Sequence, residues 1–174
     1  MYNDFVLIGP KDDPAGIKGM KDVAKTFQII KEKQACFVSR GDRSGSHVAE
    51  LNLWKATNAD IEENTGPWYK SIGLGMGAAL NFTKASDCYV LSDRGTWIHF
   101  KNKGVLQILV EGDKRMFNRY GLILVNPAKH PDVKKDPGQH FIDWLISLDG
   151  QKAIANYKIE DEQLFYPNAN DPNA

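Results

Sequence analysis

Cysteine is scarce in this chain, which has only Cys36 and Cys88 among its 174 residues. Two cysteines are too few for a disulfide scaffold, and their separation does not match the spacing of a zinc finger. We expect two buried thiols, with a single disulfide as the alternative. The cysteines therefore leave the redox compartment of the protein open.

An excess of charge of either sign is also absent. Lys+Arg and Asp+Glu number 22 each, so the formal net charge is zero with neutral histidines. Binding to nucleic acid requires a basic patch or stripe against the phosphate backbone, and we expect no nucleic-acid partner. The 4 histidines show no i, i+4 pairing. We therefore expect no metal site.

The sequence lacks an apolar run of the roughly 18 residues that would suggest a membrane-spanning helix. Its first residues, Met1 to Asp4, contain neither a basic n-region nor an apolar h-region, so no signal peptide is expected in this chain. What it does have is 42% hydrophobic and 25% charged residues, the composition of an ordinary globular domain. The length suits one domain or two small lobes.

Short β-rich runs alternate with helical patterns along the chain. Apolar residues at three- and four-residue spacing predict an amphipathic helix over 20–31. Strands are expected at 2–10, 35–38, 88–91, 105–110 and 120–125, with a last apolar piece at 163–166. Further helices are expected at 48–55, 73–83, 97–100, 139–148 and 150–157, and an irregular connection at 58–72. This alternation predicts an α/β fold with a largely parallel sheet.

Two polar loops that follow expected strands contain three of the five arginines. The first loop runs from Ser39 to His47 and holds Arg40 and Arg43, and the second runs from Ser92 to Thr96 and holds Arg94. Unpaired N–H groups at a helix N-terminus, glycines, hydroxyl groups and forked guanidinium groups together favour the binding of an anion. The loops therefore predict a site for a small oxyanion. The alternative is that their Asp and Ser residues only cap the two helices.

Several segments together resemble the tungstate-binding proteins of ABC importers. They read YNDFVLIGPKDDPAGIKG, FVSRGDRSGSH, LSDRGTW, EGD followed by FNRYGLILVNPAKHP, and FIDWLISLDGQKAIANYKI with QLFYPNA. The stretches Trp68-Tyr69 and Gly75-Met76-Gly77 also match. The resemblance extends in order from Tyr2 to about Ala169.

This resemblance implies a type II periplasmic binding protein fold, represented mainly by the second lobe with the hinge strands and C-terminal helices. Residues 1–10 would form one hinge crossover, 11–118 the second α/β lobe, and 119–174 the return hinge strand with helices that pack toward the first lobe. The first-lobe region that precedes Tyr2 in the family, with its Thr-rich ligand motif, is not present in this sequence. Exposed cleft or hinge strands, including 2–8 and 120–125, would then favour self-association.

The resemblance also implies the function. The ligand would be tungstate or molybdate, carried as a transported solute with no cofactor, and the partner would be the permease of an ABC transporter. The location would be periplasmic or extracellular. The residues that match the family's oxyanion site are Ser39, Arg40, Ser44, Gly45, Ser46 and Arg94, with Ser46 standing where the family usually has Thr. Orienting or capping roles are expected for Asp42, Asp93 and Thr96.

Two other functions have to be weighed. Phosphate-binding proteins of the same fold have a similar loop, in which the aspartate accepts the proton of a protonated phosphate. Tungstate, molybdate and sulfate are fully deprotonated at neutral pH and offer only acceptors, so the direction in which Asp42 points decides between these ligands. A hydrolase triad of Ser44, His47 and Asp42 or Asp93 lacks the G-x-S-x-G elbow. We therefore expect no enzyme activity and no catalytic residue.

Overall fold

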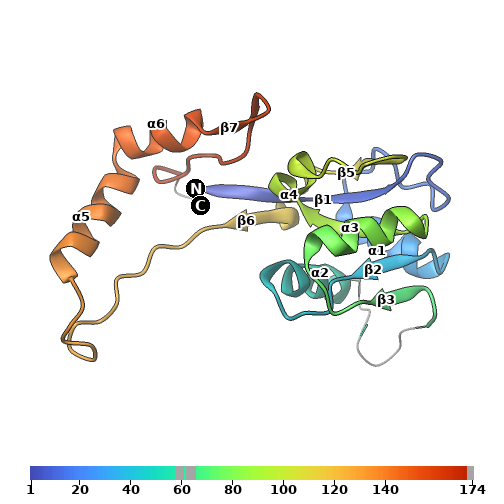
Figure 1. The fold of residues 1–174 in the computed structure, drawn as a ribbon, viewed down its shortest axis with the longest axis horizontal. Helices are drawn as coiled ribbons and strands as arrows, with labels where there is room; N and C mark the ends of the chain where they lie inside the picture. Colours follow the sequence, from blue (N-terminus) through green and yellow to red (C-terminus); the bar gives the residue numbers. More distant parts are fainter. Residues whose placement is uncertain (58–60, 62–65, 172–174) are drawn as a thin grey trace. The chain divides into compact units, whose positions relative to one another are not determined.

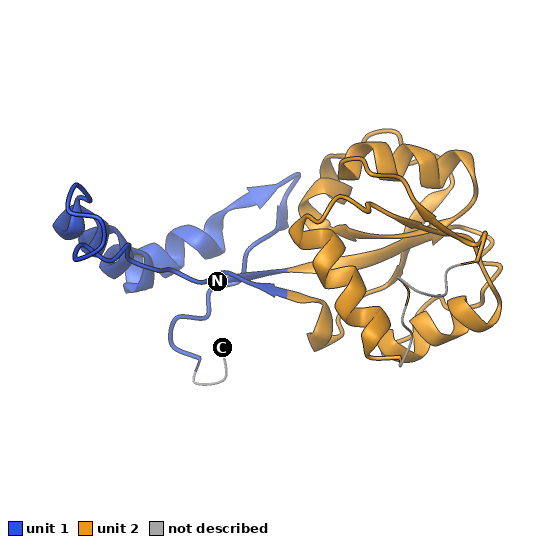
Figure 2. Ribbon diagram, turned by 90° about the horizontal axis from the view of Figure 1, so that it is seen from below, with its two compact units in different colours: residues 1–3, 118–174 blue, residues 4–117 orange. Residues whose placement is uncertain are grey.

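The computed structural model describes residues 1–57, 61 and 66–171, and the chain divides into two compact units. Unit 2 contains residues 4–117, and unit 1 contains residues 1–3 together with 118–174 (Figure 2). Unit 2 ends at Phe117 and unit 1 resumes at Asn118, one residue before the domain boundary that was expected between residues 118 and 119. The roles expected for the hinge segments remain predictions.

The main sheet has six strands, most of which belong to unit 2 (Figure 1). They are β1 (Tyr2–Pro10), β2 (Phe37–Ser39), β3 (Tyr69–Ser71), β4 (Tyr89–Asp93), β5 (Leu106–Val110) and β6 (Phe117–Arg119). The order is β3-β2-β4-β1-β5, and β6 pairs with β1. Strand β2 is parallel to both β3 and β4, whereas β1 is antiparallel to β4 and β5.

The antiparallel β1 corrects two expectations. The sheet is mixed, because its β1 runs against its neighbours β4 and β5. Strand β1 also pairs with β4 from Phe5 to Ile8 and with β5 from Leu7 to Pro10, so this part of it is not the unpaired hinge strand that was expected to recruit a second copy. Its residues from Asn3 to Pro10 are all buried, as is typical of a strand covered on both faces.

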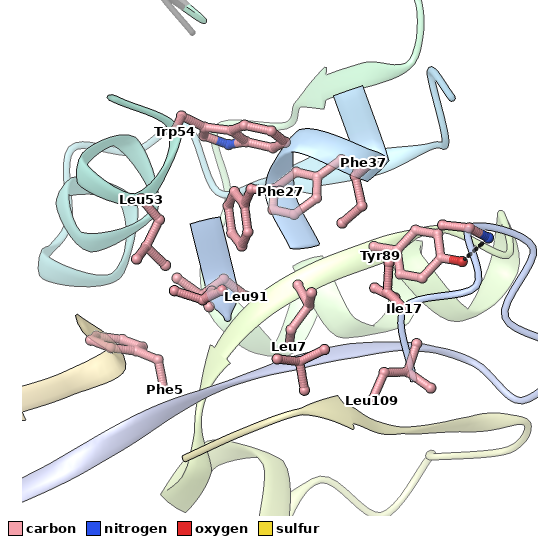
Figure 3. Packing of buried hydrophobic residues seen from close by; sticks show 14 of the residues in the cluster. Phe5, Leu7, Ile17, Phe27, Phe37, Leu53, Trp54, Tyr89, Leu91 and Leu109 are labelled. Atoms are coloured by element: carbon pink, nitrogen blue, oxygen red, sulfur yellow. Dashed lines mark hydrogen bonds between the residues drawn. The ribbon is translucent and has the colours of Figure 1, made fainter. Parts of the chain in front are cut away.

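Four helices cover the two faces of this sheet: α1 (Val23–Glu32), α2 (Gly45–Lys55), α3 (Met76–Ala85) and α4 (Arg94–His99). Side chains alternate along the strands, so Phe5 and Leu7 of β1 belong to one apolar cluster and Val6 and Ile8 to the other. The first cluster includes α1 and α2, with Phe27 packed edge-on against Trp54 (Figure 3). The second includes α3 and α4.

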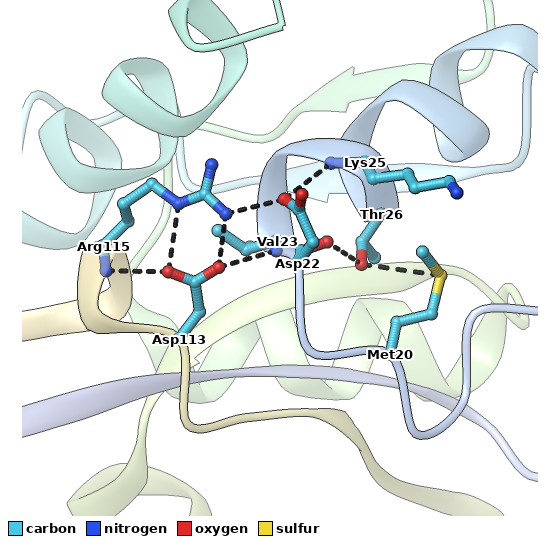
Figure 4. Close-up of polar contacts among 7 residues, drawn as sticks. All are labelled: Met20, Asp22, Val23, Lys25, Thr26, Asp113 and Arg115. Carbon is cyan, nitrogen blue, oxygen red and sulfur yellow. Dashed lines mark hydrogen bonds and ion pairs between the residues drawn. The ribbon is translucent and has the colours of Figure 1, made fainter.

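An ion-paired cluster fixes the start of α1 (Figure 4). Asp22 caps the helix, and Asp113 accepts a hydrogen bond from the Val23 N–H at 2.9 Å. Arg115, in the 3₁₀ helix η1 (Lys114–Met116), donates to both aspartates. Its hydrogen bonds hold the pKa of Asp113 down at about 2. One arginine thereby connects the beginning of α1 to the segment that leads into β6.

Unit 1 contains α5 (Lys135–Ile146), α6 (Leu148–Asn156) and the short hairpin of β7 (Lys158–Ile159) and β8 (Glu162–Gln163). The strand expected at 120–125 is wrong, because this segment makes no ladder and β6 ends at Arg119. Ile123, which lies in this segment, is 90% exposed.

Within unit 1 an apolar groove of about 670 Å³ is lined by side chains that include Leu122, Ile142 and Ile154. Among the described residues, no helix combines the length and apolar character needed to cross a bilayer.

Two more expectations are corrected in unit 2. Residues 69–71 form β3, although the region 58–72 was expected to be irregular, and residues 58–60 and 62–65 of it lie outside the described part of the chain. Cys36 and Cys88 form a disulfide and are not thiols. They stand next to each other because β2 and β4 pair in register from Phe37 and Tyr89 onward. The bond closes a segment with a sequence separation of 52.

The disulfide is expected to stabilise unit 2 substantially. Replacing both Cys36 and Cys88 by Ser should lower the free energy of unfolding by about 2–4 kcal/mol, because a crosslink across a segment of this length restricts the unfolded chain. Urea denaturation followed by circular dichroism measures the change. The wild-type chain in excess reductant should match the double variant, and equal stability with and without reductant would contradict the expectation.

Candidate oxyanion site

The two arginine-bearing loops lie at one edge of the sheet. They follow β2 and β4, which pair in parallel with Phe37 opposite Tyr89 and Val38 opposite Val90, so their carboxyl ends meet at the same edge. The expectation that both loops share an edge is therefore confirmed. In open α/β sheets this edge is where ligands bind.

Arg40 and Asp42 form the charged centre of the first loop. The Arg40 Nε and Nη2 atoms donate to Asp42 Oδ2 at 3.1 and 2.5 Å, and Asp42 Oδ1 accepts from the Ser44 N–H at 3.1 Å. Hydrogen bonds from the hydroxyl and N–H of Ser44, with the Arg40 guanidinium, lower the pKa of Asp42 to about 2. Asp42 is thus a charged acceptor whose oxygens both face the protein's own donors.

The backbone of this loop is held by the chain that follows β3. Ile72 and Leu74 donate their N–H groups to the carbonyls of Ser39 and Arg40 at 3.1 and 3.2 Å. Gly41 has a φ of +60°, and a Cβ there would collide with the Ser71 side chain. Only glycine meets both conditions, so the turn between Arg40 and Asp42 depends on Gly41.

The N-terminus of α2 supplies uncharged donors. Ser44 is the N-cap, its Oγ accepts from the His47 N–H, and the first intrahelical bond runs from Val48 to Ser44. The N–H groups of Gly45 and Ser46 precede this bond, and such groups have no intrahelical partner. Gly45 is exposed, with open space where a Cβ would stand. An oxyanion could therefore approach these N–H groups and the Ser46 hydroxyl closely.

The second loop is built differently. Asp93 caps α4 by accepting from the Thr96 N–H at 2.8 Å and the Thr96 hydroxyl at 2.7 Å. Arg94 donates two hydrogen bonds to Asp4 and one, of 2.7 Å, to Glu111. These carboxylates, Asp4 foremost, raise the pKa of Arg94 above its ordinary value. The guanidinium is already neutralised by the protein, and its assignment as a ligand residue stays a prediction.

Ser39 is fully buried, and its hydroxyl contacts groups within the protein. Its Oγ accepts from the Gly41 N–H at 3.2 Å, and the buried Glu50 follows on α2. Glu50 accepts from Trp54 Nε1 at 3.1 Å and from the Tyr69 hydroxyl at 2.6 Å. In this arrangement Ser39 supports the loop from behind, and its role as a ligand also stays a prediction.

Sequence reasoning missed Glu50 and Tyr69. A signal for Glu50 was present, because it stands four residues before Trp54 on the face of α2 that also buries Leu53. The role of Tyr69 depends on β3, which was not predicted, so its hydroxyl could not be placed beside α2.

The geometry does not form a hydrolytic triad. His47 Nδ1 accepts from the Arg43 N–H at 3.1 Å, and Asp42 binds Arg40 and Ser44. A nucleophilic serine would need a histidine base that is itself oriented by a carboxylate. What the loop offers is a set of N–H and O–H donors around one arginine, which is suited to holding an anion.

Comparison with known proteins agrees with this fold. The family model described as the PBP superfamily domain matches residues 1–149. The chain belongs to the PBP superfamily. The prediction of an α/β fold of the periplasmic-binding-protein type is thereby confirmed.

Individual relatives of this PBP-superfamily chain are named for tungstate. The tungstate-binding protein TupA of Peptoclostridium acidaminophilum is 39% identical over 97% of this chain and 59% of its own length. The structure of TupA from Desulfovibrio alaskensis G20 aligns with a TM-score of 0.87 and 45% identity, covering 97% of this chain and 68% of that one. A protein of Haloferax volcanii that is named as an ABC transporter anion-binding protein, without mention of tungstate, is 44% identical over 97% of this chain and 50% of its own. The predicted resemblance to tungstate-binding proteins is confirmed. The chain spans 50–62% of the length of the curated relatives it matches.

Burial of Glu50 should make the stability of this PBP-superfamily chain depend on pH. Desolvation raises the pKa of Glu50 from 4.5 to about 7, so between these values the folded protein holds a proton that the unfolded chain has released. The unfolding free energy should therefore fall as pH rises through this window, by about 2–3 kcal/mol relative to Glu50→Gln, which does not titrate. Urea denaturation of both proteins between pH 5 and 8 measures the difference. A difference that is constant with pH would contradict this expectation.

Proposed function

We propose that this chain contains the oxyanion-binding loop of an extracytoplasmic solute-binding protein that captures tungstate, or the similar molybdate, for an ABC importer. The observation that carries the proposal is the orientation of Asp42, whose two oxygens face Arg40 and Ser44. A dianion without protons then meets the donors of this loop, and Asp42 is turned to the protein's own donors and not toward a proton of the ligand. The names of the homologous proteins support tungstate as the solute.

The charge and donor set support the same ligand class. Arg40 Nε and Nη2 face Asp42, which leaves Nη1 available to another acceptor. The N–H groups of Gly45 and Ser46 add the positive end of the α2 dipole. In this proposal the chain is a binding protein and not an enzyme. Its location is periplasmic or extracellular, and its partner is the permease of the ABC transporter. Residues 1–10 and 119–174 would contribute the hinge.

A titration with four oxyanions tests the function. Isothermal calorimetry at neutral pH should show saturable binding of tungstate and molybdate and binding of phosphate that is at least about tenfold weaker, because the remaining P–OH proton finds no acceptor. Sulfate, smaller but also unprotonated, serves as the size control. Asp42→Asn should weaken tungstate and phosphate alike, since it releases Arg40. Selective loss of phosphate binding in that variant would show that Asp42 faces the ligand and would favour a phosphate-binding protein.

Arg40 is expected to provide the main fixed charge for the ligand. A charge-assisted hydrogen bond contributes roughly 1.5–3 kcal/mol, so Arg40→Ala should weaken tungstate binding about ten- to a hundredfold. Arg40→Lys should also lose affinity, because an ammonium group cannot fork between Asp42 and the ligand. Arg115→Ala, which also removes an aspartate-paired arginine from unit 2, is the matched control and should leave binding unchanged. Equal affinity in Arg40→Ala and wild type would remove Arg40 from the site.

A further inference from the structure

Arg94 connects three strands at the edge of the sheet that carries the oxyanion loop. Strands β4 and β5 both run antiparallel to β1, so they point the same way, and β2 is parallel to β4. Arg40, Arg94 and Glu111 directly follow β2, β4 and β5 and therefore start from the same edge. Asp4 lies there too, because it stands near the start of β1, which runs in the opposite direction. The charged groups around Arg94 thus belong to the edge at which the anion is proposed to bind.

The two carboxylates that hold Arg94 bind it in different ways. Asp4 accepts from Arg94 Nε and Nη2 with its two oxygens, at 2.8 and 2.7 Å, and its side chain is 9% exposed. Glu111 accepts from Nη2 alone, at 2.7 Å, and its side chain is 45% exposed. Within the described part of the chain, Arg94 is the one hydrogen-bond partner of the Glu111 carboxylate.

The difference in exposure decides which carboxylate can leave Arg94. Removing Asp4 would separate a buried ion pair and leave a desolvated charge without its partner, which is strongly unfavourable. Glu111 would regain water when it leaves, and ion pairs exposed to this degree contribute little to stability. Asp4 is therefore the permanent partner of Arg94, and Glu111 is the partner that can be exchanged.

An oxyanion would need the side of the guanidinium that Glu111 occupies. A guanidinium binds an anion best when two neighbouring N–H groups fork onto two of its oxygens. Nε and Nη2 of Arg94 already fork onto Asp4, so a second fork has to use Nη1 and the other proton of Nη2. Glu111 accepts from Nη2 and so fills half of this second fork. An arriving oxyanion would complete the fork after Glu111 has moved away.

We propose that Glu111 determines the affinity of the oxyanion site as the exchangeable counter-ion of Arg94, which the anion displaces when it binds to this guanidinium. The inference rests on the proposed function, since it concerns the same edge of the sheet and the same ligand. It makes Arg94 a second cationic contact beside Arg40, with Asp4 as the residue that positions it.

The first test follows the Arg94 Nε–Hε signal by nitrogen-15 NMR of the full chain without any oxyanion. Glu111→Gln removes the charge and keeps the shape, and it should leave this proton as protected from water as in wild type, because Asp4 still holds Nε. Asp4→Asn should speed its exchange with water at least about tenfold, since a charge-assisted bond is lost. Exchange that rises as much in Glu111→Gln as in Asp4→Asn would show that both carboxylates are needed to hold Arg94, and would overturn the inference.

The second test measures tungstate binding by calorimetry at neutral pH. Glu111→Gln should strengthen binding about 3–10-fold, because the anion no longer displaces a charged acceptor. Asp22→Asn is the matched control and should bind as wild type does, because Asp22 is likewise the more exposed of two carboxylates on one arginine, Arg115. Unchanged or weaker binding in Glu111→Gln would contradict the exchange.

A change of background separates displacement from a general effect of charge. Asp4→Asn with Arg94→Gln removes the buried carboxylate together with its arginine, and in this background Glu111→Gln should alter the affinity by less than about twofold. An equal gain in both backgrounds would mean that Glu111 acts through its charge alone, and would refute its role as the counter-ion of Arg94. If neither wild type nor Glu111→Gln binds tungstate, the proposed function fails, and the NMR comparison still decides whether Glu111 is the exchangeable partner.

Discussion

The parallel pairing of β2 with β4 is the constraint on which the candidate site depends. Strand β2 is only three residues long, and it is fixed by the disulfide before its first residue and by ladders to β3 and β4. Both strands end at the same edge, so Arg40 and Arg94 start from neighbouring positions. The Cys36–Cys88 disulfide lies at one end of the paired strands β2 and β4, and the loop that holds Arg40 lies at the other end. A slip of one residue would turn every side chain of β2 to the opposite face.

Two carboxylates, Asp42 in the first loop and Glu50 on the helix that follows it, lie in different environments. Asp42 lies at the partly exposed rim, where hydrogen bonds from Ser44 and Arg40 keep its pKa low and its charge fixed. Glu50 lies inside, where burial moves its pKa in the opposite direction. Asp42 sets the direction of the guanidinium, and the Ser39 hydroxyl accepts from the Gly41 N–H in the turn from which that guanidinium extends. A loop of small and polar residues thereby acquires a defined shape before a ligand arrives.

The sequence predicted much of unit 2 because local patterns agreed with the tertiary structure. Strand β1 was placed at its observed bounds, and the cap residues of α2 and α4 were among those expected. The predictions that failed depended on partners far along the chain. Residues 120–125 have the composition of a strand but form no ladder with any other part of the chain that the structure describes. Tyr69–Ser71 is too short and polar to be recognised without β2 beside it. The disulfide and the network of Glu50 follow from the same long-range pairings.

The two arginines of the site differ in how much of their charge is already matched. Arg94 has two carboxylates, and the buried Asp4 holds it bidentately, so an incoming anion would have to compete with Glu111 for the remaining interaction. Arg40 has one partner, Asp42, and lies beside the free N–H groups at the start of α2. Because opposite charges within a salt bridge largely cancel, the net attraction for an anion comes from those N–H groups and the unshared side of Arg40. Directed hydrogen bonds, more than an excess of positive charge, are therefore what this loop offers an oxyanion.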